Sequence, residues 1–148
     1  MEEKVGKEGT MKNKKRSKIV LGLGSSKFAT KVADEFRSKG WDVQTAVDGE
    51  EARRTAVRDS AHAVVVPFEP LDELSTAKVI SAVPTDSSVV MISPLANLQA
   101  TRFATLIGVA MAVESAGVAG LVSAVEGAML LKACTPVAST EAISVEAR

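Results

Sequence analysis

The sequence predicts an α/β protein, a three-layer α/β/α sandwich with a parallel sheet between two layers of helices. First, short apolar runs alternate with helix-patterned segments from Lys18 to about Cys134, which is typical of βα units with right-handed crossovers. Second, hydrophobic residues make up 46% of the chain but aromatic residues 3%, so the core must be built from the small branched residues that suit a buried parallel sheet. Third, 148 residues leave room for one such domain.

Each element follows from a local pattern. Uninterrupted apolar runs ended by glycine, proline or an Asp-Gly turn predict the strands: residues 19–21, 41–47, 63–66, 89–93 and 119–122. Apolar residues at helical spacing predict the helices, with a serine cap before the first and a glycine after the first and the fourth: residues 26–39, 50–60, 74–83, 98–115 and 126–133. Five strands and five helices in this length indicate the flavodoxin-like strand order 2-1-3-4-5, whose ligands bind at the carboxyl ends of the strands.

The two ends of the chain are polar or weakly patterned. Residues 1–17 are expected to be a flexible tail with a basic cluster, residues 18–134 the folded domain, and residues 135–148 a second tail. The net charge of zero makes nucleic acid an improbable partner and favours no anionic membrane. Cys134 is the single cysteine, and no apolar run approaches the roughly 20 residues that span a bilayer. We therefore expect a soluble cytoplasmic protein.

Several segments resemble the response-regulator receiver (CheY-like) family over most of the chain. They are KIVLGLG, FRSKGWDVQTAVDGEEA, AHAVVVPFEP, VVMISP and AGVAGLVSAVEGAMLLKA. The second of these is the most characteristic, because receivers often carry an aromatic-led strand followed by A-x-DG-x-EA. The resemblance implies the receiver fold and a role in signalling through a two-component pathway.

The residues that the family uses for phosphorylation are missing at the matching positions. The resemblance puts the aspartate nucleophile at Val66, four residues before Pro70, and the magnesium-binding acidic pair at Leu23 and Gly24. It puts the phosphoryl-pairing lysine at Ala124, and the fourth-strand hydroxyl survives as Ser93. Magnesium requires carboxylate oxygens, which these side chains lack. The sequence therefore predicts a pseudo-receiver without a phosphorylation site, a metal or a cofactor.

An alternative is a nucleotide- or phosphate-binding α/β domain. Gly22, Gly24, Ser25 and Ser26 form a glycine-rich turn between a strand and a helix, where backbone N–H groups and the helix dipole attract phosphate. The third glycine of the dinucleotide fingerprint is replaced by Lys27. A cobalamin-type domain shares the strand order, but His62, the single histidine, lies before the third strand rather than after the first. No nucleophile elbow or zinc-protease motif is present, so no enzyme activity is expected.

The expected function is protein–protein interaction. The segment 98–115 is unusually apolar and longer than the corresponding receiver segment by about two helical turns, so a helix there should expose an apolar face. We expect this long fourth helix and its neighbour to bind a signalling protein or to form a dimer. The expected contact residues are Phe103, Leu106, Ile107, Met111, Met129 and Leu130.

Overall fold

The computed structural model describes residues 16–94 and 97–142, with side chains as far as Lys132. Strands and helices alternate along the chain, as the sequence predicts. The elements in order are β2 (Lys18–Leu21), α2 (Lys27–Ser38), β3 (Asp42–Thr45), α3 (Gly49–Asp59), β4 (Ala63–Pro67), α4 (Glu73–Ser81), β5 (Ser88–Ser93), α5 (Leu98–Ile107), β6 (Ala110–Val113), the short 3₁₀ helix η2 (Glu114–Ala116) and α6 (Gly117–Ala142).

The five strands form one parallel sheet in the order β3-β2-β4-β5-β6, which is the predicted order 2-1-3-4-5. The central strand β4 pairs with β2 on one side and with β5 on the other. Its residues are almost completely buried, as expected for a strand covered on both faces. The fold class is therefore confirmed.

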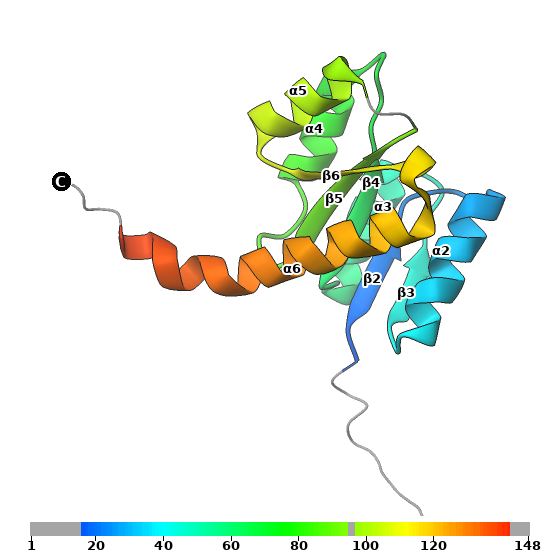
Figure 1. Ribbon diagram of the computed structural model, residues 1–148, viewed down its shortest axis with the longest axis horizontal. Helices are drawn as coiled ribbons and strands as arrows, with labels where there is room; N and C mark the ends of the chain where they lie inside the picture. The colour runs from blue at the N-terminus through cyan, green and yellow to red at the C-terminus, as the bar shows by residue number, and fades with distance from the viewer. Residues whose placement is uncertain (1–15, 95–96, 143–148) are drawn as a thin grey trace, which may run out of the picture.

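Helices cover the two faces of the sheet separately (Figure 1). On one face α2 and α6 bury Val32, Phe36, Leu121 and Val125 against the sheet. On the other face lie α3, α4 and α5, and residues such as Ala52 bury against the sheet there. Along β4 successive side chains alternate between the two layers, because side chains of a strand point to opposite faces.

The prediction of one long fourth helix over residues 98–115 is wrong. The segment divides into α5, which ends where Gly108 adopts a left-handed conformation with φ of 81°, and the edge strand β6. The predicted fifth strand at residues 119–122 instead belongs to α6. The error has a physical cause: a short, wholly apolar run fits a buried strand and a buried helix equally well, so periodicity does not distinguish them.

Helix α6 is the longest element, with 26 residues. It crosses the sheet and extends beyond it toward the C-terminus (Figure 1). The window Glu114–Lys132 has the length and composition of a membrane-spanning helix, with a mean hydropathy of 1.3 and 17% of the window buried. The sequence prediction missed this window because charged residues interrupt it. Leu121, Val122 and Val125 within it pack against the sheet.

The predicted tails lie mostly outside the described residues. Arg16 and Ser17 are the described residues of the basic N-terminal segment. Lys18, which follows them, begins β2. In the C-terminal segment, the backbone of α6 continues to Ala142, where the sequence predicts a weakly patterned tail. The side chain of Cys134 lies outside the described residues.

Candidate functional site

The carboxyl ends of β2, β4 and β5 surround a hollow of about 290 Å³, which we call the strand-end hollow. The ends of parallel strands meet at one edge of the sheet, which is where such folds bind their ligands. The residues that line it are Gly22, Leu23, Val47, Asp48, Pro67, Phe68, Glu69, Ile92, Ser93, Pro94 and Glu114. Of the five residues predicted for a degenerate phosphorylation pocket, Leu23 and Ser93 are among them.

Val66 lies close to the strand-end hollow but does not line it. Its side chain is 1% exposed and packs in the layer of α3 and α4. There it approaches the backbone of Gly49 so closely that a Cβ at that position would lie 3.2 Å from Val66 Cγ1. The end of β4 is formed by Pro67 and Phe68, and the Phe68 N–H donates to Ile92 O at 2.8 Å. The position predicted for the nucleophile is therefore core hydrocarbon.

The predicted position of the phosphoryl-pairing lysine needs correction. Ala124 lies in α6, because the fifth strand is β6 rather than residues 119–122. The residue that follows β6 and lines the strand-end hollow is Glu114. Gly24, with φ of 75°, is also outside the hollow lining. Among the described residues, no lysine or arginine lines the hollow, and a carboxylate follows the fifth strand.

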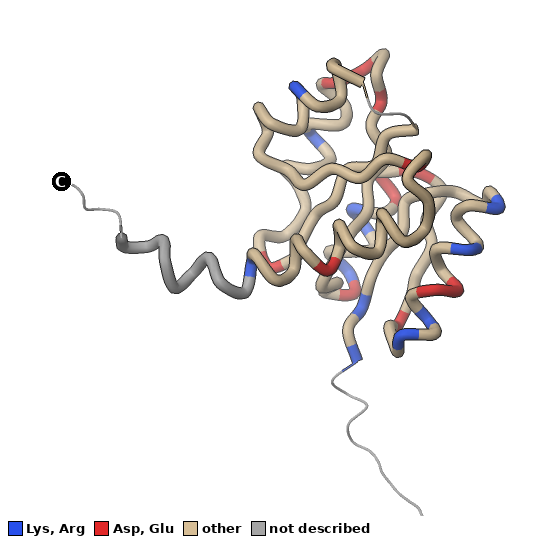
Figure 2. The backbone as a smooth tube through the Cα atoms, viewed as in Figure 1, with Lys and Arg blue, Asp and Glu red and all other residues tan. Residues whose placement is uncertain are grey.

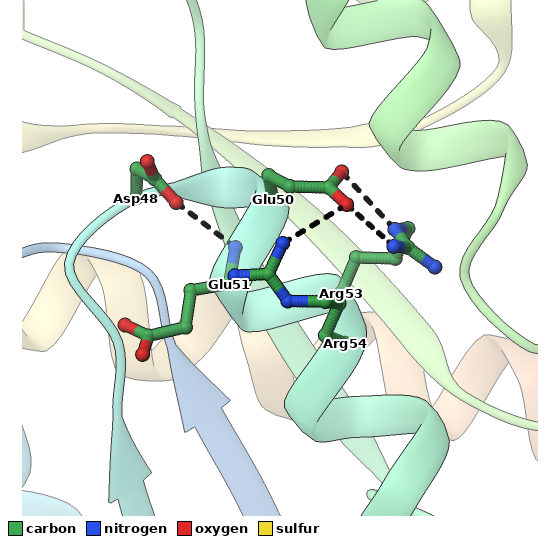
Figure 3. Close-up of polar contacts among 5 residues, drawn as sticks. All are labelled: Asp48, Glu50, Glu51, Arg53 and Arg54. Atoms are coloured by element: carbon green, nitrogen blue, oxygen red, sulfur yellow. Dashed lines mark hydrogen bonds and ion pairs between the residues drawn. The ribbon is translucent and has the colours of Figure 1, made fainter.

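Three carboxylates line the strand-end hollow: Asp48, Glu69 and Glu114. Asp48 is also the N-cap of α3, since its Oδ1 accepts a hydrogen bond from Glu51 N at 2.9 Å (Figure 3). The Glu69 N–H donates to Thr76 Oγ1 at 3.0 Å, which connects the loop after β4 to α4. Within residues 16–94 and 97–132, no group of three His, Cys, Asp or Glu side chains is arranged to hold a metal ion.

A second hollow of about 250 Å³ lies between α3, α4 and the end of β4, and Val66 lines this one. Glu50 is on its rim and accepts hydrogen bonds from Arg53, at 2.5 Å, and from Arg54, at 3.4 Å (Figure 3). The hydrogen bond from Arg53 is the main cause that lowers the pKa of Glu50 below its ordinary value. The carboxylate of Glu50 is therefore already bonded to two arginines and is not free to bind a ligand.

The glycine-rich turn uses its backbone donors internally. The Gly22 N–H donates to Val65 O at 2.9 Å and the Gly24 N–H to Ala46 O at 3.0 Å. Ser26 caps α2, its hydroxyl accepting from Ala29 N at 3.1 Å. Ser25 and Ser26 are exposed. Because two N–H groups that a phosphate would need are already bonded, the alternative phosphate-binding function has little support here.

His62 lies at the opposite end of the sheet from the strand-end hollow. Its Nδ1 accepts a hydrogen bond from Lys18 N at 2.9 Å, where β2 begins. The imidazole is exposed and joins the starts of two strands. It has a structural role at that edge.

The predicted interaction residues do not form one helix face. Phe103, Leu106 and Ile107 belong to α5, Met111 to β6, and Met129 and Leu130 to α6. Phe103 is buried, 7% exposed, and its ring lies 5.2 Å from that of Phe68. Leu106, Ile107 and Leu130 are exposed, whereas the two methionines are partly buried. The sequence prediction thus found three exposed apolar residues that do lie on helices, whereas Met111, expected in the fourth helix, belongs to β6.

Sequence reasoning missed the acidic lining of the strand-end hollow. Asp48 has a signal, the Asp-Gly turn after the second strand, but the turn alone does not show that its carboxylate faces a hollow. Glu114 gave no signal, because the segment before it was assigned to a helix. Only the correct position of β6 brings Glu114 to the strand ends.

Comparison with known proteins agrees with this architecture. No family model and no curated protein matches the chain. The solved structure of the chemotaxis protein CheY4 from Vibrio cholerae is similar with a TM-score of 0.62 and 16% identity, over 76% of this chain and 98% of that one. A LuxR-family DNA-binding response regulator from Staphylococcus aureus matches with a TM-score of 0.61 and 11% identity, over 76% and 98%.

A third solved structure is a response regulator from Burkholderia pseudomallei with a phosphorylated aspartic acid and a calcium ion. It matches with a TM-score of 0.59 and 18% identity, over 84% of this chain and 75% of that one. Identities at this level establish the architecture and no more. The chain has the fold of response-regulator receiver domains.

Proposed function

We propose that this chain is a receiver-like signalling module that binds protein partners and is not regulated by phosphorylation. In this role the sheet and its helices form a rigid platform, and the specificity lies in exposed helix faces and loops. Regulation comes from binding or oligomerisation, because the position of the receiver's phosphorylated aspartate is taken by the buried hydrocarbon of Val66. The pathway is of the two-component type, which the names of the similar solved proteins, a response regulator and a chemotaxis protein, support.

The lining of the strand-end hollow is the observation that carries this proposal. The hollow is lined by hydrocarbon from Leu23, Pro67 and Phe68 and by carboxylates, and no lysine or arginine lines it in the part of the chain that the structure describes. A phosphoryl group brings negative charge, and a like charge at about 4 Å costs about 4 kcal/mol near a protein surface. Transfer of a phosphoryl group needs cations around the reacting oxygens, and among the described residues no three His, Cys, Asp or Glu side chains are arranged to hold the metal ion that would supply one.

Acetyl phosphate with Mg²⁺ provides the test of phosphoryl transfer. We expect the intact mass of the purified chain to stay unchanged after incubation, and calorimetric titration with Mg²⁺ to give no saturable heat. The Burkholderia pseudomallei regulator, solved with a phosphorylated aspartic acid, is the positive control in the same incubation. If this chain gains the mass of a phosphoryl group on any carboxylate, the proposal is wrong.

The interaction role is tested with the chain as bait in a pull-down from its host. We expect the same recovered proteins whether or not the bait has been incubated with acetyl phosphate, because no phosphorylated state exists to change the binding surface. A set of partners that depends on acetyl phosphate would contradict the proposed regulation. An absence of any partner would contradict the interaction role itself.

A further inference from the structure

Four exposed leucines gather around α4 and α5. Leu71 is 99% exposed, Leu74 65%, Leu98 68% and Leu106 85%. Together with the charged residues between them they form what we call the α4–α5 patch. Large apolar side chains exposed together on a soluble domain mark a contact surface.

Hydrogen bonds and a hollow make the patch one continuous surface. Gln99 Nε2 donates to Pro70 O at 2.8 Å and to Glu73 Oε2 at 2.7 Å, which fastens α5 to the loop before α4. The hollow between them is about 450 Å³. It is lined by Glu73, Leu98, Gln99, Arg102, Phe103 and Leu106.

The patch has two halves of opposite charge, and each half carries two exposed leucines. On α5, Arg102 lies four residues from both Leu98 and Leu106, so the three side chains share one face of the helix. Its guanidinium forms no hydrogen bond or ion pair with any described residue. At the start of α4, the acidic pair Asp72-Glu73 lies between Leu71 and Leu74. Figure 2 shows acidic and basic positions close together in the region of α4 and α5.

We propose that the α4–α5 patch binds the same patch of a second copy of this chain. A two-fold axis brings the basic half of each copy to the acidic half of the other, so that one ion pair, Arg102 with Glu73, occurs twice. The leucines beside each charge then cover one another. The overall net charge of zero adds no general repulsion between the copies.

This inference rests on the proposed interaction role and names the partner for it. It also replaces the contact surface expected from the sequence, which reached across β6 to Met129 and Leu130. Stable dimers bury about 800 Å² on each partner, so a patch built from two short helices indicates a reversible dimer. Its mass should therefore rise with concentration.

Charge reversal gives a sharp test by sedimentation of the full chain over a range of concentrations. We expect the wild type to approach the mass of a dimer at high concentration. Arg102→Glu and Glu73→Arg should each weaken self-association roughly 10-fold or more, because like charges then face each other at both pairs. An equal mixture of the two variants should regain the dimer, since each reversed charge meets its opposite. Circular dichroism of each variant shows whether it is folded.

Exposed leucines supply a matched pair of variants. Leu106→Ser, within the patch, should weaken the dimer, while Leu130→Ser on α6, whose leucine is 67% exposed, should leave it unchanged. If Leu130→Ser alone abolishes the dimer, the contact lies on α6 and the proposal is wrong. It is equally wrong if the wild type stays monomeric at all concentrations or if the charge-reversed mixture does not associate.

The two proposals fail in different measurements. A gain of mass from acetyl phosphate would overturn the proposed function without bearing on sedimentation. A monomeric chain that still recovers a partner in the pull-down would overturn the self-association and leave the interaction role in place.

Discussion

At the scale of single residues, the most consequential position is Val66. It replaces the aspartate that the receiver resemblance implies, and it is almost completely buried between β4 and the α3–α4 layer. Restoring a carboxylate there would place a charge in hydrocarbon. Arg53 and Arg54, on α3, are bonded to Glu50.

Val66→Asp should therefore lower the free energy of unfolding by roughly 3–5 kcal/mol, the cost of an unpaired buried charge. Urea denaturation at neutral pH measures the change. Val57→Asp is the control, because Val57 is 50% exposed on α3, and surface substitutions usually change stability by less than about 1 kcal/mol. An unchanged stability for Val66→Asp would mean that the side chain reaches solvent through the neighbouring hollow and that the site is not tightly filled.

Gly22 has a packing role that a ligand-binding interpretation of its turn overlooks. A Cβ at this position would lie 2.9 Å from Val65 O and 3.0 Å from Ala52 Cβ. Both atoms belong to the core, so neither can move away without cost. The close approach of the chain after β2 to β4 and α3 requires a residue without a side chain.

Alanine substitutions at two glycines should change stability in opposite directions. Gly22→Ala should destabilise the fold by roughly 1–3 kcal/mol, the usual cost of overpacking a core. Gly127→Ala should stabilise it by about 0.5–1 kcal/mol, because this helical glycine faces open space and alanine favours a helix. Thermal unfolding of both variants under the same conditions makes the comparison. A neutral Gly22→Ala would contradict the close packing of the turn.

At the scale of elements, α6 differs most from what its composition suggests. The window Glu114–Lys132 is apolar enough for a membrane, yet its first turns complete the core on one face of the sheet. Leu121 is fully buried there, whereas Leu130 is 67% exposed on the outer side of the same helix. Substituting each leucine therefore tests whether α6 packs against the sheet as part of the domain.

Leu121→Ala should lower the free energy of unfolding by roughly 2–5 kcal/mol, because it leaves a cavity between α6 and the sheet. Leu130→Ala should have an effect below about 0.5 kcal/mol. Chemical denaturation followed by circular dichroism tests both. Equal and small effects would show that α6 is detached from the sheet in solution.

The division of the segment 98–115 into α5 and β6 is also decided at the scale of elements. Gly108 N–H donates to Ala104 O at 2.8 Å in a left-handed helix end, a conformation that glycine adopts without strain. The chain then turns back to pair beside β5. A glycine inside an apolar run is therefore better evidence of a helix end than the run is of a continuous helix.

At the scale of the whole molecule, charge is distributed unevenly over the surface. Carboxylates collect at the carboxyl ends of the strands, with Asp48, Glu69 and Glu114 drawn from three separate connections. The total charge of zero conceals this local excess. The α4–α5 patch, in contrast, carries both signs, and this is why we expect it to associate with a copy of itself.

The sequence by itself determined the strand order, the covering of both faces, and seven of the ten principal elements to within about two residues at each end. These follow from local patterns of apolar, glycine and capping residues, which act over a few positions. The tertiary structure alone decided where the fifth strand runs, which carboxylates line the strand-end hollow, and that Val66 faces the α3–α4 layer. Those outcomes depend on which apolar segment pairs with β5 to form the edge of the sheet. Segments far apart in the sequence compete for that position, so local patterns do not predict the result.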